Sequence, residues 1–232
     1  MGERVFLIAL LVAMGAGWGL TMPLAKIAVS EGYRQFGLIF WQVVISAVLL
    51  GAIVALRGKG LPLGRAQLRM YLVIALLGTV LPNTASYQAA IYLPAGVIAI
   101  LLSAVPMFAF PIALLMANDR FSRVRLGGLV CGLLGVVLLV GPEASLPERA
   151  MVMFIPLALV APVFYGLESN FVARYGTAGL DPLQLLCGAS VVAAAIALPL
   201  ALASGQWIDP RPPYGAPDWA LILSSAIHAV VY

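Results

Sequence analysis

Charge is the scarcest property of this sequence. Only 9% of its 232 residues are Asp, Glu, Lys or Arg, whereas 63% are hydrophobic. Soluble chains carry about 25% charged and roughly 45–50% apolar residues. A soluble fold of this length would have too few polar side chains to cover its surface. The composition therefore excludes a soluble domain and predicts an integral membrane protein, whose first partner is the lipid bilayer.

Motifs for chemistry are scarce as well. There is one histidine, and the two cysteines, Cys131 and Cys187, lie inside apolar runs, which disfavours a disulfide framework or a metal site. The sequence has no Gly-x-x-x-x-Gly-Lys-Ser/Thr loop, no His-Glu-x-x-His and no Gly-x-Ser-x-Gly. The net charge of +4 is not gathered into a basic patch with interleaved aromatics. We therefore expect no enzyme activity, no cofactor, no metal and no nucleic-acid partner.

The uncharged runs predict the transmembrane helices. A helical span needs roughly 20 mostly apolar residues. The longest run, Met70–Asn118, has 49 residues and fits two spans, separated at Leu93-Pro94-Ala95-Gly96. Seven full helices are expected, near residues 5–28, 36–56, 70–92, 95–117, 124–141, 151–174 and 182–204. An eighth begins near Asp218 and spans roughly 22 Å, less than the roughly 30 Å hydrocarbon core, so we expect it to be truncated.

The Lys and Arg residues predict the orientation, because cytoplasmic segments are enriched in both. With the N-terminus in the cytoplasm, nine Lys or Arg residues fall on the inner side and four on the outer side. The segment 57–69 contributes most to this difference. The expected location is a bacterial inner (plasma) membrane with a cytoplasmic N-terminus.

An internal repeat links the two parts of the chain. Gly17-Trp18-Gly19-Leu20 is followed by polar Thr21, and Phe164-Tyr165-Gly166-Leu167 is followed by Glu168, at an offset of 147 residues. The same offset relates Gly32 to Gly179 and Tyr71 to Asp218. Five spans per copy is an odd number, so the copies would be inverted in the membrane, as in secondary transporters. The expected units are residues 1–142 and an incomplete second copy over 150–232.

These residues resemble the EamA members of the drug/metabolite transporter superfamily. The resemblance rests on Gly17-Trp18-Gly19 with Lys26, on the run from Ala89 to Pro106, and on Asp119 to Arg125 leading into Gly127-Gly128. It covers the whole chain and is strongest over 1–142. It implies a ten-helix fold of two five-helix repeats, of which this chain would hold seven helices and part of an eighth.

Glu168 is the leading candidate for a functional residue, because ionisable side chains inside a membrane are costly and usually functional. Tyr165, Glu168 and Ser169 fall on one helix face. Two interpretations remain open. Glu168 either binds a solute or a proton in a cavity between the repeats, or pairs with Arg174 near the helix end.

Other polar side chains within the spans extend this candidate site. Lys26 either binds solute or extends its amine to the lipid headgroups. Asn83, Ser86 and Tyr87 form a polar stripe that either lines a cavity or joins helices by hydrogen bonds. Pro106 is a candidate hinge. The remaining candidates are Trp18, Thr21, Trp41, Gln42, Ser103 and His228.

The leading functional hypothesis is a secondary transporter that exports small metabolites or amino-acid-like solutes by alternating access. One alternative is an inactive or partner-dependent fragment of such a transporter, and a membrane-embedded enzyme is less favoured. Proton coupling and a homodimer are left open by the sequence. The substrate, the coupling ion and the direction of transport have no signature in it.

Overall fold

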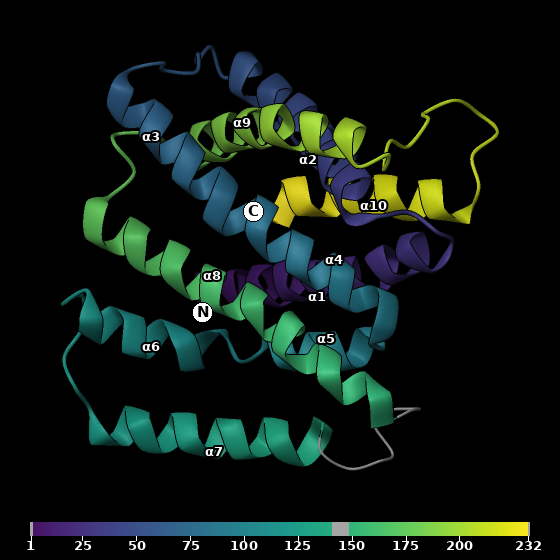
Figure 1. The fold of residues 1–232 in the computed structure, drawn as a ribbon. Helices are drawn as coiled ribbons and strands as arrows, with labels where there is room; N and C mark the ends of the chain where they lie inside the picture. The colour runs from purple at the N-terminus through teal and green to yellow at the C-terminus, as the bar shows by residue number, and fades with distance from the viewer. Residues whose placement is uncertain (1, 141–148, 232) are drawn as a thin grey trace.

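The computed structural model describes residues 2–140 and 149–231, which are helical and contain no strand (Figure 1). The helices are α1 (Gly2–Ser30), α2 (Gln35–Leu56), α3 (Arg65–Ile74), the π-helical η1 (Ala75–Val80), α4 (Leu81–Tyr92), α5 (Ala95–Leu102), α6 (Val105–Leu115), α7 (Arg123–Val140), the 3-10 helix η3 (Arg149–Phe154), α8 (Ile155–Tyr175), α9 (Pro182–Ala203) and α10 (Ala216–Val231).

Six helical stretches of the described residues are long and apolar enough to cross a membrane. They are Arg4–Ser30, Gln35–Leu56, Arg65–Tyr92, Ala95–Leu115, Ala150–Tyr175 and Pro182–Ala203. The fold is therefore that of a polytopic membrane protein. The helices α7 and α10 are not among the six, so the count of seven helices plus a truncated eighth stays a prediction. The last residue of the expected helix over 124–141 lies outside the described residues.

Two helix boundaries differ from the expectation. The third span begins at Arg65 rather than at residue 70, because a charged residue marks the edge of the membrane and not the end of a helix. The span expected near 95–117 is found at Ala95–Leu115, but it is not one regular helix, because the chain turns at Ser103 and Ala104 between α5 and α6. Pro106 has no N–H to donate to the carbonyl of Leu102, which explains a break at this position.

The helices of the two halves of the chain are interleaved (Figure 1). Helix α2 packs against α9, and α10 packs against both α1 and α2. Helix α8 packs against α4 and α6, and α3 packs against α9. Helix α7 lies at one edge against α5 and α6 (Figure 1). Its apolar side chains are largely exposed, as expected for a face toward lipid.

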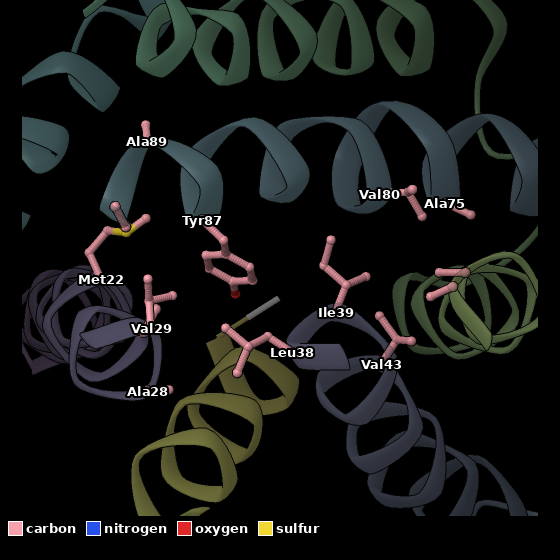
Figure 2. Packing of buried hydrophobic residues seen from close by; sticks show 14 of the residues in the cluster. Met22, Ala28, Val29, Leu38, Ile39, Val43, Ala75, Val80, Tyr87 and Ala89 are labelled. Atoms are coloured by element: carbon pink, nitrogen blue, oxygen red, sulfur yellow. The ribbon is translucent and has the colours of Figure 1, made fainter. Parts of the chain in front are cut away.

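The core cluster runs through most of the bundle, and one part of it lies between α1, α2 and α4 (Figure 2). Met22 and Val29 come from α1, Ile39 and Val43 from α2, and Tyr87 from α4. Figure 2 shows the Tyr87 ring pointing from α4 into the space between α1 and α2. Small residues at the contacts, such as the fully buried alanines of the cluster, let the backbones approach closely, which is how membrane helices gain packing energy.

Helix α9 contacts α3 through a glycine. A Cβ atom at Gly188 would overlap the ring of Tyr71, which is buried with 2% of its surface exposed. The ring is also held by a hydrogen bond from its hydroxyl to the carbonyl of Pro62 at 3.1 Å. Gly188 is therefore required for this contact.

We expect Gly188→Ala to lower the free energy of unfolding by about 1–3 kcal/mol, the usual cost of overpacking a core. The measurement is thermal unfolding of the purified protein in detergent. Gly51→Ala is the matched control, because a Cβ there would lie 3.7 Å from the Cys187 sulfur, an ordinary contact. Equal melting temperatures for the two variants would contradict this packing.

Candidate functional site

Two cavities lie next to each other in the helix bundle. The first, of about 50 Å³, has as polar lining Gln42, Ser46, Thr79, Asn83, Glu168, Ser190 and His228. The second, of about 140 Å³, has as polar or aromatic lining Trp18, Thr21, Asn83, Ser86, Tyr87, Ser103, Tyr165 and His228. Asn83 and His228 line both cavities. The two cavities therefore share a wall, and their residues come from helices of both halves of the chain.

Ten of the fourteen candidate residues line these cavities. They are Trp18, Thr21, Gln42, Asn83, Ser86, Tyr87, Ser103, Tyr165, Glu168 and His228. Polar side chains avoid lipid in a membrane protein, so those on different helices gather in the interior. Their role in function stays a prediction.

Lys26 lies outside both cavities. Its contact is neither with a solute nor with the lipid headgroups, the two partners that the sequence suggested. Its Nζ donates a hydrogen bond of 2.5 Å to the backbone carbonyl of Ala90. Ala90 is in the last turn of α4, which ends at Tyr92, where the helix has no N–H of its own for the final carbonyls. Lys26 thus caps the C-terminus of α4, where a positive charge also interacts favourably with the helix dipole.

Three other candidates also lie elsewhere. The Trp41 indole donates to the carbonyl of Ile208 at 3.0 Å and packs on neighbouring aromatic rings. The Ser169 hydroxyl donates to the carbonyl of Gly166 within α8. Pro106 stands in the first turn of α6, beside the break between α5 and α6.

The Glu168 carboxylate lies against the backbone of η1. A Cβ atom at Gly78 would overlap both carboxylate oxygens, so the glycine makes room for them. Among the described residues, Glu168 has no hydrogen bond or ion pair, and the alternative pairing with Arg174 is not seen there. Single π-helical turns often occur at functional sites. A buried carboxylate of this kind is satisfied by a proton or by a cationic ligand.

A hydrogen-bonded group lies in the wall between the cavities. The Tyr87 hydroxyl donates to Gln42 Oε1 at 2.5 Å, and Gln42 Nε2 lies 2.8 Å from His228 Nδ1. The Tyr165 hydroxyl lies 3.4 Å from Asn83 Oδ1, within reach of a weak hydrogen bond. The first set of contacts joins α2, α4 and α10, and the second pair joins α8 to α4, through polar contacts that the lipid phase could not replace.

Sequence reasoning missed four residues of the first cavity, Ser46, Gly78, Thr79 and Ser190. Ser46 stands four residues after Gln42 and so shares its helix face, a signal that was present in the sequence. Thr79 stands four residues before Asn83, but the π-helical segment shifts the helical register between them. Gly78 has no side chain, and only the position of the Glu168 carboxylate shows its importance.

Comparison with known proteins gives two matches. Residues 5–141 match the model of the EamA-like transporter family. A protein of Bacillus subtilis (strain 168) named "Uncharacterized transporter YoaV" is 25% identical over 162 residues, which cover 66% of this chain and 52% of that protein. The chain thus spans about half the length of the curated relative it matches.

We expect Gly78→Ala to push the Glu168 carboxylate away from η1 and further into the first cavity. The rate at which a water-soluble carbodiimide modifies Glu168, measured by mass spectrometry, should rise several-fold. Gly19→Ala is the matched control, because a Cβ there meets no atom within 4 Å although Gly19 lines the second cavity. Equal rates in both variants would contradict the role of Gly78.

Proposed function

The chain belongs to the EamA-like transporter family, and from this we propose that the two central cavities are where a small solute crosses the membrane by alternating access. Membership in this family supports a membrane transporter as the complete protein. The finer proposal is export of small metabolites or amino-acid-like solutes. It concerns the complete transporter, because the chain spans about half the length of its relative.

The position of Glu168 is the single observation that carries this proposal. The carboxylate lies in a cavity lined by α2, η1 and α4 from residues 1–142 and by α8, α9 and α10 from residues 150–232. A site between two repeats is where secondary transporters bind solutes. A carboxylate next to amide, hydroxyl and imidazole groups suits a solute with a cationic group beside an acceptor group, as in an amino acid.

The pattern of helix contacts supports an inverted repeat. If residues 1–142 and 150–232 are two copies, α10 corresponds to the continuous span of α3, η1 and α4. Exchanging the copies turns the contact of α1 with α10 into that of α8 with this span, made by α4. The same exchange turns the contact of α2 with α10 into that of α9 with this span, made by α3. All four contacts are present, and α2 and α9, which exchange with each other, pack together.

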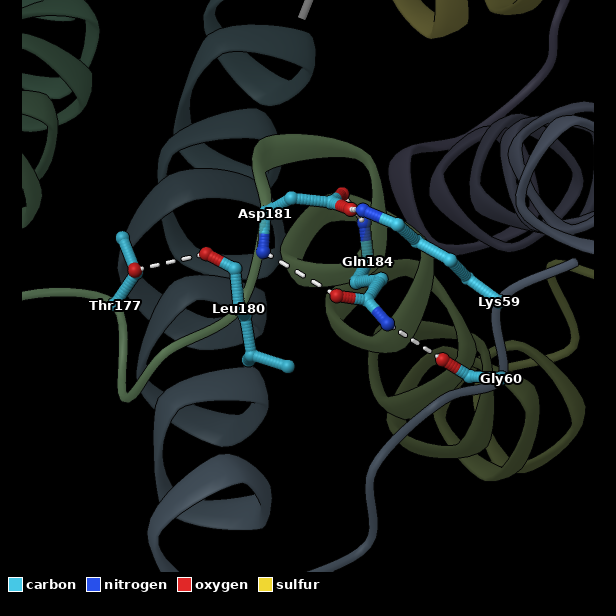
Figure 3. A network of polar contacts seen from close by, with 6 residues as sticks. All are labelled: Lys59, Gly60, Thr177, Leu180, Asp181 and Gln184. Atoms are coloured by element: carbon cyan, nitrogen blue, oxygen red, sulfur yellow. Dashed lines mark hydrogen bonds and ion pairs between the residues drawn. The ribbon is translucent and has the colours of Figure 1, made fainter. Parts of the chain in front are cut away.

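A polar cluster joins the α2–α3 loop to the start of α9. In this Lys59 cluster, Lys59 Nζ lies 2.6 Å from Asp181 Oδ2, and Gln184 Nε2 donates to the carbonyl of Gly60 at 2.7 Å (Figure 3). Asp181 is the N-cap of α9 and forms a capping box with Gln184. The hydrogen bond from Lys59 lowers the pKa of Asp181. Because this pKa is lowered, the ion pair is formed at neutral pH. It is lost only when the pH falls below the ordinary pKa range of an aspartate and Asp181 is protonated.

A second cluster joins the start of α2 to the α9–α10 loop and α10. In this Gln206 cluster, Gln206 Oε1 accepts from the backbone N–H of Phe36 at 3.0 Å, and the Tyr33 hydroxyl donates to Asp218 at 2.6 Å. Burial, together with the hydrogen bond to Asp218, raises the pKa of Tyr33 to about 12. Tyr33 therefore stays a neutral donor at physiological pH.

The two clusters are related by the repeat. Gln206 stands 147 residues after Lys59, and each reaches the N-terminus of the second helix of the other copy. Figure 1 shows the α2–α3 and α9–α10 loops at opposite ends of the bundle. Both clusters are formed in this structure. Alternating access requires that one end opens while the other stays closed, and the paired clusters are suited to that exchange.

We expect Lys59→Met to open the end of the bundle at the Lys59 cluster. Cys187 reports on this, because its buried thiol belongs to an apolar cluster with Leu50 and Val54, against which Leu61 of the α2–α3 loop packs. In a Cys131→Ser background, its rate of reaction with a maleimide should rise several-fold.

The control for this experiment is Arg211→Met, which removes the exposed ion pair of Arg211 with Asp209 at the other end. That variant should react at the parental rate. Equal rates for Lys59→Met and Arg211→Met would contradict the closing role of the Lys59 cluster.

We expect Glu168→Gln to abolish solute flux or its dependence on pH, because the neutral amide can neither carry a proton nor balance a cation. The measurement is flux of a panel of radiolabelled amino acids in proteoliposomes between pH 5.5 and 8.5, with the outward direction tested by preloading. Glu31→Gln, in the exposed α1–α2 loop, is the control. Unchanged flux with unchanged pH dependence would exclude the coupling role.

A further inference from the structure

A third cavity lies at the end of the bundle where α9 connects to α10. Its volume is about 310 Å³, within the range of roughly 300–1,000 Å³ that ligand sites occupy. Residues of α2, of the α9–α10 loop and of the first turns of α10 line it. No residue of its lining is shared with either central cavity. The third cavity is therefore a separate candidate site.

Most of the lining of this cavity is apolar and lies along a membrane-spanning helix. Ile45 of α2 and Leu221 and Ile222 of α10 contribute to it. Ile45 stands ten residues after Gln35, the first residue of α2, which corresponds to about 15 Å along the helix. The hydrocarbon core of a bilayer is about 30 Å thick. The apolar lining thus extends to the depth of the lipid chains, where it suits an alkyl chain better than a water-soluble ligand.

The polar part of the lining is a single carboxylate. Asp218, in the first turn of α10, lines the cavity together with the aromatic rings of Trp41 and Tyr214. Its Oδ1 accepts from the Tyr33 hydroxyl at 2.6 Å, and its Oδ2 accepts from the backbone N–H of Gly215 at 2.7 Å. Both donors are neutral. In the part of the chain that the structure describes, no basic side chain pairs with Asp218, so the protein does not balance its charge.

We propose that this third cavity binds a membrane lipid with an ammonium headgroup, such as phosphatidylethanolamine. The apolar lining contacts an acyl chain, and Asp218 accepts hydrogen bonds from the ammonium group. The rings of Trp41 and Tyr214 add the attraction that aromatic faces exert on a cation. An anionic lipid such as phosphatidylglycerol would bring a second negative charge to Asp218 with no cation to offset it. Charge complementarity therefore selects the ammonium headgroup.

The lipid would also contact the Gln206 cluster, because Asp218 belongs both to that cluster and to the cavity. A ligand stabilises the state that binds it, so the lipid would stabilise the contacts between α2 and α10 at this end. The binding site itself does not rest on the proposed function. A chain that binds the lipid and moves no solute would count against transport and not against this inference.

Native mass spectrometry of the full chain tests the site. The purified protein, in a neutral detergent, is mixed with equal concentrations of phosphatidylethanolamine and phosphatidylglycerol that carry the same acyl chains. The measurement is the ratio of protein bound to each lipid. We expect the parent chain to retain phosphatidylethanolamine several-fold more. Equal retention, or a preference for phosphatidylglycerol, would overturn the proposal.

Asp218→Asn removes the charge but keeps an oxygen that can accept from the Tyr33 hydroxyl. We expect this variant to retain the two lipids equally. Glu31→Gln is the matched control, because it removes one negative charge from the exposed α1–α2 loop, which adjoins Tyr33 at the same end of the bundle. The control should keep the parental ratio. A parental ratio in a folded Asp218→Asn variant would overturn the proposal.

A change in the lipid keeps the test available if the Asp218 variant does not fold. Acetylation of the amine of phosphatidylethanolamine removes the cation and leaves the protein intact. We expect the parent chain to bind the acetylated lipid several-fold more weakly, and equal binding would overturn the proposal. Free ethanolamine in large excess should not displace the lipid, because it has no chain for the apolar lining. Displacement would identify a soluble amine as the ligand and would overturn the assignment to a lipid.

Discussion

The hydrocarbon core of a bilayer offers no partner for a polar group, and the arrangement of this protein depends on that constraint. Each polar side chain within the spans must find a partner in the protein or face a cavity. A helix satisfies most of its own backbone groups. The side chains of Gln42, Asn83, Tyr87 and His228 meet in one wall between two cavities. The same requirement that stabilises the fold therefore collects the groups that a solute would contact.

That constraint also explains what the sequence could predict. Polar residues in apolar helices were expected to gather, and Gln42, Asn83 and Glu168, although on different helices, line one cavity. The contact of Lys26 could not be predicted, because its partner is a backbone carbonyl, which every residue possesses. The break at Ser103 needed the local geometry around a proline. The π-helical turn at Gly78 leaves no pattern in the amino acids, since it alters the register of an otherwise continuous helix.

The two end clusters are equivalent in position but not in chemistry. Lys59 makes an ion pair at one end, whereas Gln206, at the corresponding place in the proposed repeat, makes a neutral hydrogen bond at the other. A charged contact weakens with ionic strength, and a neutral one does so much less. An inverted repeat that kept its symmetry would have equal ends. Because the side chains differ, the contacts at the two ends respond differently to the ionic strength of the solution on each side.

The strength of the Lys59 cluster is limited by its exposure. The side chain of Lys59 is 49% exposed and that of Asp181 is 23% exposed, and ion pairs so open to water contribute little to stability. This end of the bundle is therefore stabilised mainly by the apolar cluster around Leu50, Val54 and Cys187. The ion pair and the hydrogen bond to Gly60 then fix how the loop is placed on α9. Weak polar contacts over a small apolar cluster suit the opening that the proposed alternating access requires, because two states exchange readily only when their free energies are close.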